Sequence, residues 1–257
     1  MKNLRRYFVL IITLLLTHGF LHAQETALGD TLFSFNAGVM TPTPDRALFG
    51  VEYVDGHLWM TGADPDDLWQ HKLYKFTADG QTLVETYEYG LEFVGWAGLA
   101  YDGEHLWTAG VDTIWQIDVT NGQKTGVKIV APQYYNKGLA YDPATDHFWV
   151  AGDANIIYEI DKQGNIVNSV SFLPDQGMSG LAWDNVSEGG PYLWIWAMKY
   201  TPSDVRPKAY QMNVQTGTLT EVTFEGVLMN PQAPYAADGA AGATITDQLI
   251  DGKLTLI

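Results

Sequence analysis

Short apolar runs alternate with turn residues at a regular spacing along this chain. The stretch from Gly98 to Asp118 reads GLAYD, then HLW, then IWQID. The same pattern returns from Gly138 and from Gly180, and a looser copy begins at Gly50. The leading glycines of the four copies are 48, 40 and 42 residues apart. A period in the low forties, filled with short strands and turns, is typical of propeller blades.

Each copy predicts four strands, and the second copy shows them most clearly. Its inner strand is Leu99–Tyr101, its second Leu106–Ala109, its third Thr113–Val119 and its outer strand Val127–Val130. The pair Asp102-Gly103, between the first two apolar runs, is a strong signal for a hairpin turn. No segment shows a convincing helical period, which favours an all-β fold.

Two further features recur in every copy. A turn with glycine separates the third and fourth strands: Asp79-Gly80, Asn121-Gly122, Gln163-Gly164 and Thr216-Gly217. A tryptophan recurs in the second strand: Trp59, Trp107, Trp149 and Trp194. We interpret these large flat side chains as core residues that fill the gap between one blade and the next.

The repeats predict a β-propeller of four-stranded antiparallel blades, with about five blades and an incomplete last one. The repeats span residues 48–89, 96–132, 137–174, 178–227 and 240–257, all approximate. Within the N-terminal segment 24–47, an isolated strand at Thr31–Phe35 is suited to complete the last blade. That blade would still lack a strand, so either the chain is a fragment or the ring closes imperfectly. We favour a fragment, because a last strand ending at Leu256-Ile257 would leave an apolar edge exposed.

Residues 1–23 resemble a secretory signal peptide. Lys2, Arg5 and Arg6 precede the short apolar run Tyr7–Leu16, and Ala23 provides a small residue before a cut at Gln24. An uncleaved anchor is the alternative, although the run is short for a membrane span. We expect a mature chain that does not span the membrane and is secreted, with attachment to the cell surface left open.

Composition narrows the classes of function. The chain has 14 basic and 30 acidic residues, a formal net charge of −16, and no cysteine. The acidity argues against nucleic acid as a partner, because affinity for phosphates comes mainly from Lys and Arg. The absence of cysteine excludes disulfides, thiolate catalysis and cysteine-bound metals. We interpret the acidity mainly as a contribution to solubility, with calcium or cationic partners as the less favoured alternative.

The GLAYD, HLW and YxID copies resemble the repeats of secreted bacterial propellers of the YVTN/NHL-like group. They also resemble five-bladed glutamine-cyclotransferase-like propellers, and the resemblance covers roughly residues 48–257. It implies the fold but no single activity, since such propellers include enzymes, adhesins and scaffolds. Members of these families often belong to longer proteins with a C-terminal sorting or adhesion module.

An enzymatic hypothesis depends on Glu52. Propeller lactonases of the gluconolactonase kind hold a divalent cation with carboxylates from several inner strands. The equivalent inner positions here are Glu52, Ala100, Ala140 and Ala182, too few oxygens for a hard cation. A cyclotransferase-like reaction needs a carboxylate acid/base, for which Glu52 and Glu92 are the candidates. Glu52 is thus a weak catalytic candidate, the alternative being an acid solvated in the channel.

The recurring histidines and aspartates are more typical of residues that stabilise turns than of metal ligands. His57, His105 and His147 recur at one repeat position, where equivalent side chains lie apart around the ring and cannot share an ion. We interpret them as bonding to turns, and we expect His71 to be exposed. The inner-strand ends Asp102, Asp142 and Asp184 are typical turn residues. A calcium site remains a weak hypothesis for the acids of the first insertion: Asp64, Asp66 and Asp67.

A non-catalytic binding role is our leading hypothesis. The loops that lead into the inner strands share one face of a propeller, and five aromatic residues and a methionine occur there: Phe93, Trp96, Tyr134, Tyr135, Tyr235 and Met178. Such side chains suit recognition of a protein or a glycan at the cell surface, without a cofactor. A propeller hydrolase or lyase with Glu52 near the channel is the alternative, and a structural spacer without a ligand is a third hypothesis.

Overall fold

The computed structural model describes residues 34–45, 47–63, 70–91, 96–172, 176–201, 204–226, 242–250 and 253–257. The chain divides into two units between Ser34 and Phe35, and the fold described below is that of the second unit. The segment 1–23 and most of the predicted strand Thr31–Phe35 lie outside the described residues, and Ser34 and Phe35 are not in a strand. In the part that is described, no helix is long and apolar enough to cross a membrane.

In the described ranges, β1 to β16 form four antiparallel sheets, each a meander of four consecutive strands. Blade 1 consists of β1 (Val51–Val54), β2 (His57–Ala63), β3 (Gln70–Thr77) and β4 (Leu83–Leu91). Blade 2 consists of β5 (Leu99–Tyr101), β6 (His105–Ala109), β7 (Thr113–Asp118) and β8 (Lys124–Val130). Blade 3 consists of β9 (Asn136–Asp142), β10 (His147–Gly152), β11 (Ile156–Ile160) and β12 (Ile166–Ser171). Blade 4 consists of β13 (Gln176–Asp184), β14 (Tyr192–Thr201), β15 (Asp204–Asn213) and β16 (Thr218–Glu225).

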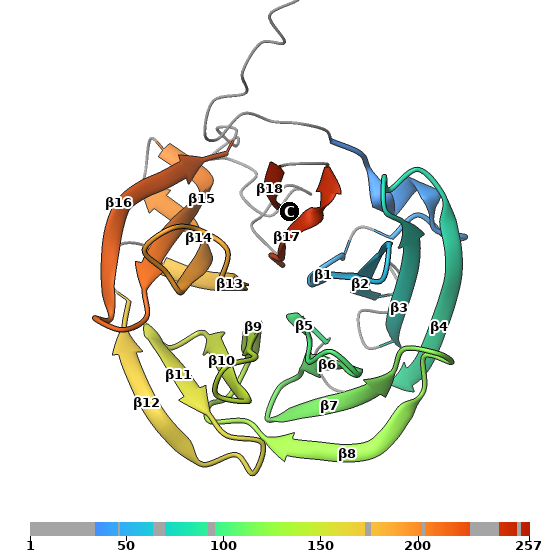
Figure 1. The fold of residues 1–257 in the computed structure, drawn as a ribbon. Helices are drawn as coiled ribbons and strands as arrows, with labels where there is room; N and C mark the ends of the chain where they lie inside the picture. Colours follow the sequence, from blue (N-terminus) through green and yellow to red (C-terminus); the bar gives the residue numbers. More distant parts are fainter. Residues whose placement is uncertain are drawn as a thin grey trace, which may run out of the picture. The chain divides into compact units, whose positions relative to one another are not determined.

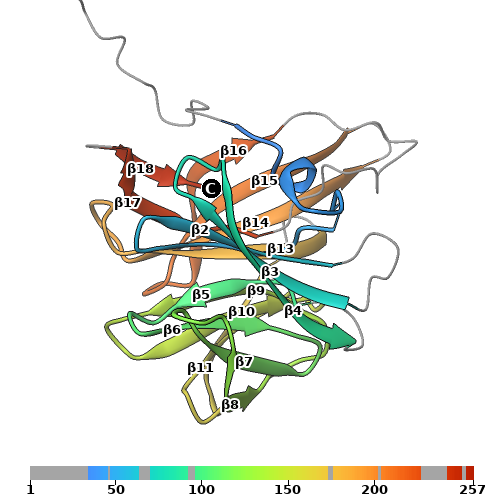
Figure 2. The same cartoon turned by 90° about the vertical axis from the view of Figure 1, so that its right-hand side faces the viewer.

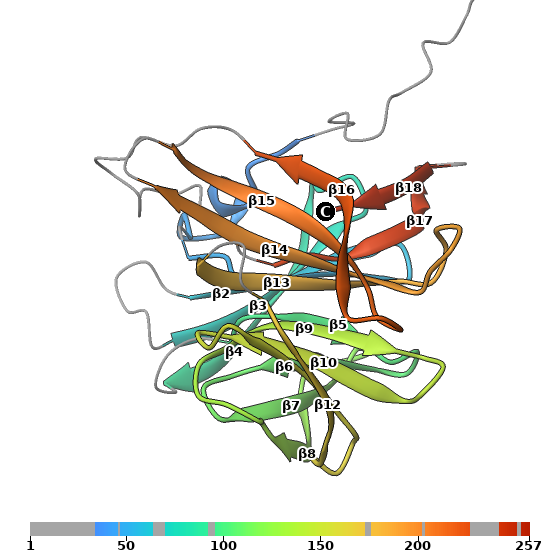
Figure 3. The same cartoon turned by 90° about the vertical axis from the view of Figure 1, so that its left-hand side faces the viewer.

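The sheets are arranged as the blades of a β-propeller, as the repeat predicts. Figure 1 looks along the central axis, with β1, β5, β9 and β13 innermost and β4, β8, β12 and β16 at the rim. Figures 2 and 3 view the blades from two opposite sides and show how the strands of each sheet twist between axis and rim. A short 3₁₀ helix, Ala37–Met40, precedes the first blade and packs on its core.

A fifth, two-stranded sheet consists of β17 (Ile245–Ile250) and β18 (Lys253–Leu256). It lies between blades 4 and 1, because Leu256 packs with the Trp194 cluster of blade 4 and Ile257 with the Val51 cluster of blade 1. Both C-terminal side chains are half-buried, so neighbouring blades partly cover the apolar edge expected there. The described fold is therefore consistent with a five-bladed ring whose last blade has two described strands.

The core lies between the blades. The four repeated tryptophans are buried in clusters that join successive blades, which confirms their interpretation as core residues: Trp59, Trp107, Trp149 and Trp194. In the cluster between blades 2 and 3, for example, the rings of Trp107 and Phe148 lie 5.1 Å apart. Since each blade is apolar on both faces, it is stable only beside its neighbours.

The leading glycine of the repeat lets the inner strands approach one another. A Cβ atom on Gly98 would lie 2.5 Å from the backbone nitrogen of Leu139 in the next blade. A Cβ atom on Gly138 would lie 2.8 Å from the Leu181 side chain of the blade after that. Gly50 and Gly242 face the following blade in the same way, at Ala97 and Val51. Glycine recurs at this position because no side chain fits there.

Candidate functional site

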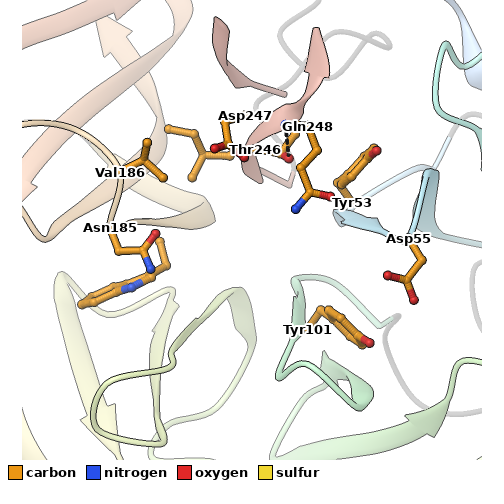
Figure 4. Close-up of a pocket in the computed structure, with 10 residues that line it drawn as sticks. Tyr53, Asp55, Tyr101, Asn185, Val186, Thr246, Asp247 and Gln248 are labelled. Atoms are coloured by element: carbon orange, nitrogen blue, oxygen red, sulfur yellow. Dashed lines mark hydrogen bonds between the residues drawn. The ribbon is translucent and has the colours of Figure 1, made fainter. Parts of the chain in front are cut away.

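A cavity of about 240 Å³ opens where the inner strands end, at one mouth of the central channel. Aromatic side chains from three blades line it, namely Tyr53, Tyr101 and Trp183. The other lining residues, several of them polar, come from the turns after β1 and β13 and from β17: Asp55, Asn185, Val186, Ile245, Thr246, Asp247 and Gln248. Figure 4 shows these side chains arranged around an open centre.

The repeat itself places these residues together. Tyr53, Tyr101 and Trp183 occupy the fourth position of the pattern that begins with the leading glycine, and each lies at or next to the end of an inner strand. Because the inner strands are neighbours around the axis, equivalent residues at their ends meet at the same mouth. This cavity was not predicted from the sequence, although an aromatic residue recurs at one position in each of four copies and was a usable signal.

The cavity has an acidic character. Asp55 and Asp247 are exposed in its lining, and none of the described residues that line it is a lysine or an arginine. The pKa of Tyr101 is raised, first by burial and then by the negative charges of Asp55, Asp102 and Glu104. A negative potential next to an aromatic ring favours a cationic or hydrogen-bond-donating ligand group over an anionic one.

Glu52 does not face water in the channel as an isolated acid. Its Oε1 accepts hydrogen bonds from the hydroxyl of Thr244 and from the backbone N–H of Tyr53 at 2.8 Å. The backbone of Tyr101 adds a further hydrogen bond, so blades 1 and 2 and the segment before β17 all contact this carboxyl group. Burial raises the pKa of Glu52 to about 7, although these hydrogen bonds act in the opposite direction. Glu52 is thus more than an acid held by channel water alone, although its side chain remains half-buried rather than fully enclosed.

The face predicted to bind a ligand is only partly available. Trp96 and Met178 are each 1% exposed, and Trp96 stacks on His71, so neither offers a surface to a partner. Tyr134 is 55% exposed and contacts the half-buried Tyr135 edge-on, with ring centres 4.5 Å apart. These two tyrosines remain candidates for binding. The other two predicted contacts, Phe93 and Tyr235, lie outside the described residues.

Of the three repeated histidines, His57 confirms the predicted bond to a turn, whereas His147 contacts a glutamate on β11 and His105 Nδ1 lies 3.9 Å from Glu104 Oε2. His57 Nδ1 lies 3.0 Å from the carbonyl oxygen of Asp55 in the turn, and His147 Nδ1 lies 2.8 Å from Glu159 Oε1. His71, expected to be exposed, is fully buried, because it lies on β3 under Trp96 and accepts a hydrogen bond from the Trp96 backbone.

Metal ligands do not converge in the part of the chain that is described. No group of three or more His, Asp or Glu side chains there is arranged to hold an ion. The three acids of the weak calcium hypothesis, Asp64, Asp66 and Asp67, lie outside the described residues, so that hypothesis remains a prediction.

The aspartates at the strand ends have the predicted turn role and an additional one. Asp102 Oδ1 accepts hydrogen bonds from the backbone of His105 at 2.7 Å and of Glu104 at 3.0 Å. Its Oδ2 accepts one from Trp107 Nε1 at 2.8 Å. Burial acts to raise the pKa of Asp102, but these donors outweigh it and the pKa is lowered. Blade 2 thus connects its turn aspartate to its core tryptophan.

Comparisons with known proteins support the fold and leave the activity open. No protein-family model matches the chain, and no curated protein matches it. Among solved structures, glutaminyl cyclase from Myxococcus xanthus is similar, with a TM-score of 0.56 and 16% identity over 82% of this chain and 86% of that one. The WD40 domain of Neurospora crassa Pan2 gives a TM-score of 0.47 and 12% sequence identity, over 79% of this chain and 56% of that one. The WD40 repeats of RRP9 give a TM-score of 0.46 and 10% sequence identity, over 70% of this chain and 52% of that one. At these identities the likeness is one of fold, and the fold is a β-propeller.

Proposed function

We propose that this chain is a secreted, non-catalytic propeller that binds a protein or a glycan through the cavity at the end of its inner strands. The observation that carries this proposal is the composition of the cavity, which is lined by aromatic rings from three blades together with polar side chains. Flat rings provide contact area at a low cost in conformational entropy, and a few polar groups then fix the orientation of the ligand.

The position of the cavity supports binding of a group that projects from a larger partner. It is an open mouth formed by turns and strand ends, and two of its polar residues, Asn185 and Gln248, are exposed. A partner can therefore insert one side chain or one sugar while the surrounding turns contact its surface. A secreted location, inferred from residues 1–23, would bring this face to extracellular proteins and glycans.

Glycan and peptide arrays probed with the labelled mature protein would identify a ligand. Tyr101→Ala and Trp183→Ala are expected to weaken its binding by about tenfold or more, since each removes a ring from the cavity. Tyr134→Ala is the matched control, because Tyr134 lies at the opposite end of the inner strands. Loss of binding in Tyr134→Ala and Tyr135→Ala, with normal binding in the cavity variants, would move the site to the other face.

A second candidate function, acid/base catalysis, is favoured by the environment of Glu52. A carboxyl group with a pKa of about 7 can both donate and accept a proton near neutral pH. The propeller fold is compatible with an enzyme, as the glutaminyl cyclase of similar fold shows for itself. A screen of lactones, esters and N-terminal glutamine peptides tests this candidate. Turnover that survives in Glu52→Gln would exclude Glu52 as the acid/base.

A further inference from the structure

Tyr141 in blade 3 shows how this repeat holds an ammonium group. Lys162 Nζ lies over the ring of Tyr141, 5.4 Å from its centre. The same nitrogen lies 2.7 Å from Asp146 Oδ1 and 3.2 Å from Asp102 Oδ2, the second of these from the preceding blade. An aromatic face and two carboxylates thus surround one internal cation, a combination that stabilises an ammonium by both charge and quadrupole.

The junction between blades 1 and 2 repeats the aromatic ring and the acids. Tyr101 is equivalent to Tyr141, because Tyr101 pairs with Leu106 and Leu106 with Ile117, just as Tyr141 pairs with Phe148 and Phe148 with Ile160.

Carboxylates accompany Tyr101 as they accompany Tyr141. Glu104 directly precedes the repeated histidine, as Asp146 does, and Asp55 comes from the preceding blade, one position beyond Val54, which is the equivalent of Asp102. Both Asp55 and Glu104 exert a negative charge on the hydroxyl of Tyr101. Two acids therefore act on this ring as well, one at the position of Asp146 and one displaced by a residue from the position of Asp102.

At the junction between blades 1 and 2, a valine occupies the position that Lys162 has at the junction between blades 2 and 3. Lys162 directly follows Asp161, which caps the turn after β11, whereas Val119 directly follows Asp118, which caps the turn after β7. Val119 is half-buried and packs on the core between blades 1 and 2. Tyr101 and Asp55 also line the cavity at the channel mouth; Val119 is not one of its lining residues, and among the described residues that lining contains no lysine or arginine.

We propose that the cavity binds the side-chain ammonium of a lysine from a partner protein, held by Tyr101 and Asp55 as Lys162 is held at Tyr141. This inference rests on the proposed binding function and narrows it to a lysine-bearing protein. The net charge of −16 favours a basic partner, because long-range attraction accelerates encounter with it. Asp247, exposed on the other side of the cavity, adds to the same potential.

The test uses a five-residue peptide with one central lysine between glycines, acetylated at its N-terminus and amidated at its C-terminus. Calorimetric titration at low ionic strength compares it with the same peptide carrying an acetylated lysine side chain. A third peptide, with a free N-terminus and no lysine, distinguishes a side-chain ammonium from a terminal one. We expect the lysine peptide to bind at least about tenfold more tightly than either of the others.

Variants of the protein test where the ammonium group of the peptide binds. Val119→Lys supplies an internal cation at Tyr101 and is expected to weaken binding of the lysine peptide at least about tenfold, whereas Val119→Met, of similar length and uncharged, leaves it unchanged. Asp55→Asn is expected to weaken binding about fivefold or more, whereas Asp112→Asn, an exposed acid in the loop at the opposite face, does not. Thermal unfolding of each variant establishes that it is folded.

Several outcomes would overturn the inference. Equal binding of the acetylated peptide, tighter binding of the peptide with only a terminal amine, or no binding of the lysine peptide would each do so. Equal affinity in Val119→Lys and Val119→Met would do so as well, and if Val119→Lys does not fold, equal affinity in Asp55→Asn and Asp112→Asn decides against it. If an array ligand binds at the cavity without an ammonium, the proposed function stands and only this inference fails.

Discussion

Trp194 on β14 donates the hydrogen of its indole nitrogen to Asp184 Oδ2 at the end of β13, across 3.0 Å. Both side chains are buried, and Asp184 Oδ1 accepts backbone hydrogen bonds from Val186 and Ser187. One carboxylate therefore holds the turn after the inner strand and the tryptophan that fills the space between blades. Blade 2 has the same connection between Asp102 and Trp107.

Asp184→Ala is expected to destabilise the protein by about 2–4 kcal/mol, because it leaves three buried or half-buried N–H donors without their acceptor. Urea unfolding followed by tryptophan fluorescence measures the change. Asp161→Ala is the matched control, since Asp161 caps an exposed turn through Gln163 and Asn165. A loss in Asp184→Ala no larger than in Asp161→Ala would contradict the structural role of the aspartate–tryptophan pair.

Blade 3 departs from this arrangement, and the departure predicts a difference between two tryptophans. Asp142 Oδ2 accepts a hydrogen bond from Thr145 instead, and Trp149 Nε1 is buried with no partner among the described residues. Trp149→Phe therefore removes an N–H group that has no hydrogen-bond partner among the described residues. Trp194→Phe, in contrast, breaks a hydrogen bond to a carboxylate. We expect Trp194→Phe to cost about 1–2 kcal/mol more in unfolding free energy. Equal losses would show that the indole hydrogen bond adds nothing measurable.

Glu52 predicts a pH dependence of stability. Its pKa rises from 4.5 to about 7 on folding, so between these values the folded state keeps a proton that the unfolded state has released. The free energy of unfolding therefore falls as pH rises through this window, and above about pH 7 the buried charge costs about 3 kcal/mol.

Glu52→Gln isolates this effect, since the amide keeps an oxygen for Thr244 and Tyr53. Relative to the wild type, the variant is expected to gain about 3 kcal/mol of stability between pH 4.5 and pH 8. Urea unfolding of both proteins at several pH values gives the difference, in which the other titrating groups cancel. A difference that stays constant across this range would mean that the carboxyl group of Glu52 is not buried.

The close approach at Gly98 predicts a large effect from a small substitution. Gly98→Ala forces a methyl group against the backbone of blade 3, where nothing flexible can yield, and is expected to cost more than about 3 kcal/mol. Gly126→Ala faces open space at a φ of 93° and reports only the backbone strain, about 1 kcal/mol. Thermal unfolding compares the two variants. Similar losses would show that the inner strands can move apart to accept a side chain.

The blades could be predicted from the sequence because they depend on local signals. The Asp102-Gly103 hairpin, the recurring tryptophans and the period of the leading glycines all act within one repeat. The burial of Trp96, Met178 and His71 could not be predicted in this way. Each of these residues lies near the start of a strand or beside an insertion, where packing by other segments decides its exposure.

The surroundings of the candidate functional residues also depend on segments far apart in the sequence. Glu52 was correctly identified as the unusual inner residue, but its surroundings depend on Thr244, 192 positions away in the chain. The cavity was missed because an aromatic residue inside an apolar strand indicates core by default. Only the arrangement of the blades around the axis shows that Tyr53, Tyr101 and Trp183 line a common opening.

The contacts of the leading glycines have a consequence for variation in this fold. Since backbone touches the neighbouring blade where the inner strands begin, the width of the ring is set by main-chain atoms that every sequence shares. The fourth position of the pattern is not constrained in this way, and it holds three tyrosines, a tryptophan and an isoleucine around the ring: Tyr53, Tyr101, Tyr141, Trp183 and Ile245. Substitution at the mouth can therefore change what the opening recognises while its diameter stays the same, so binding preference and architecture can evolve independently.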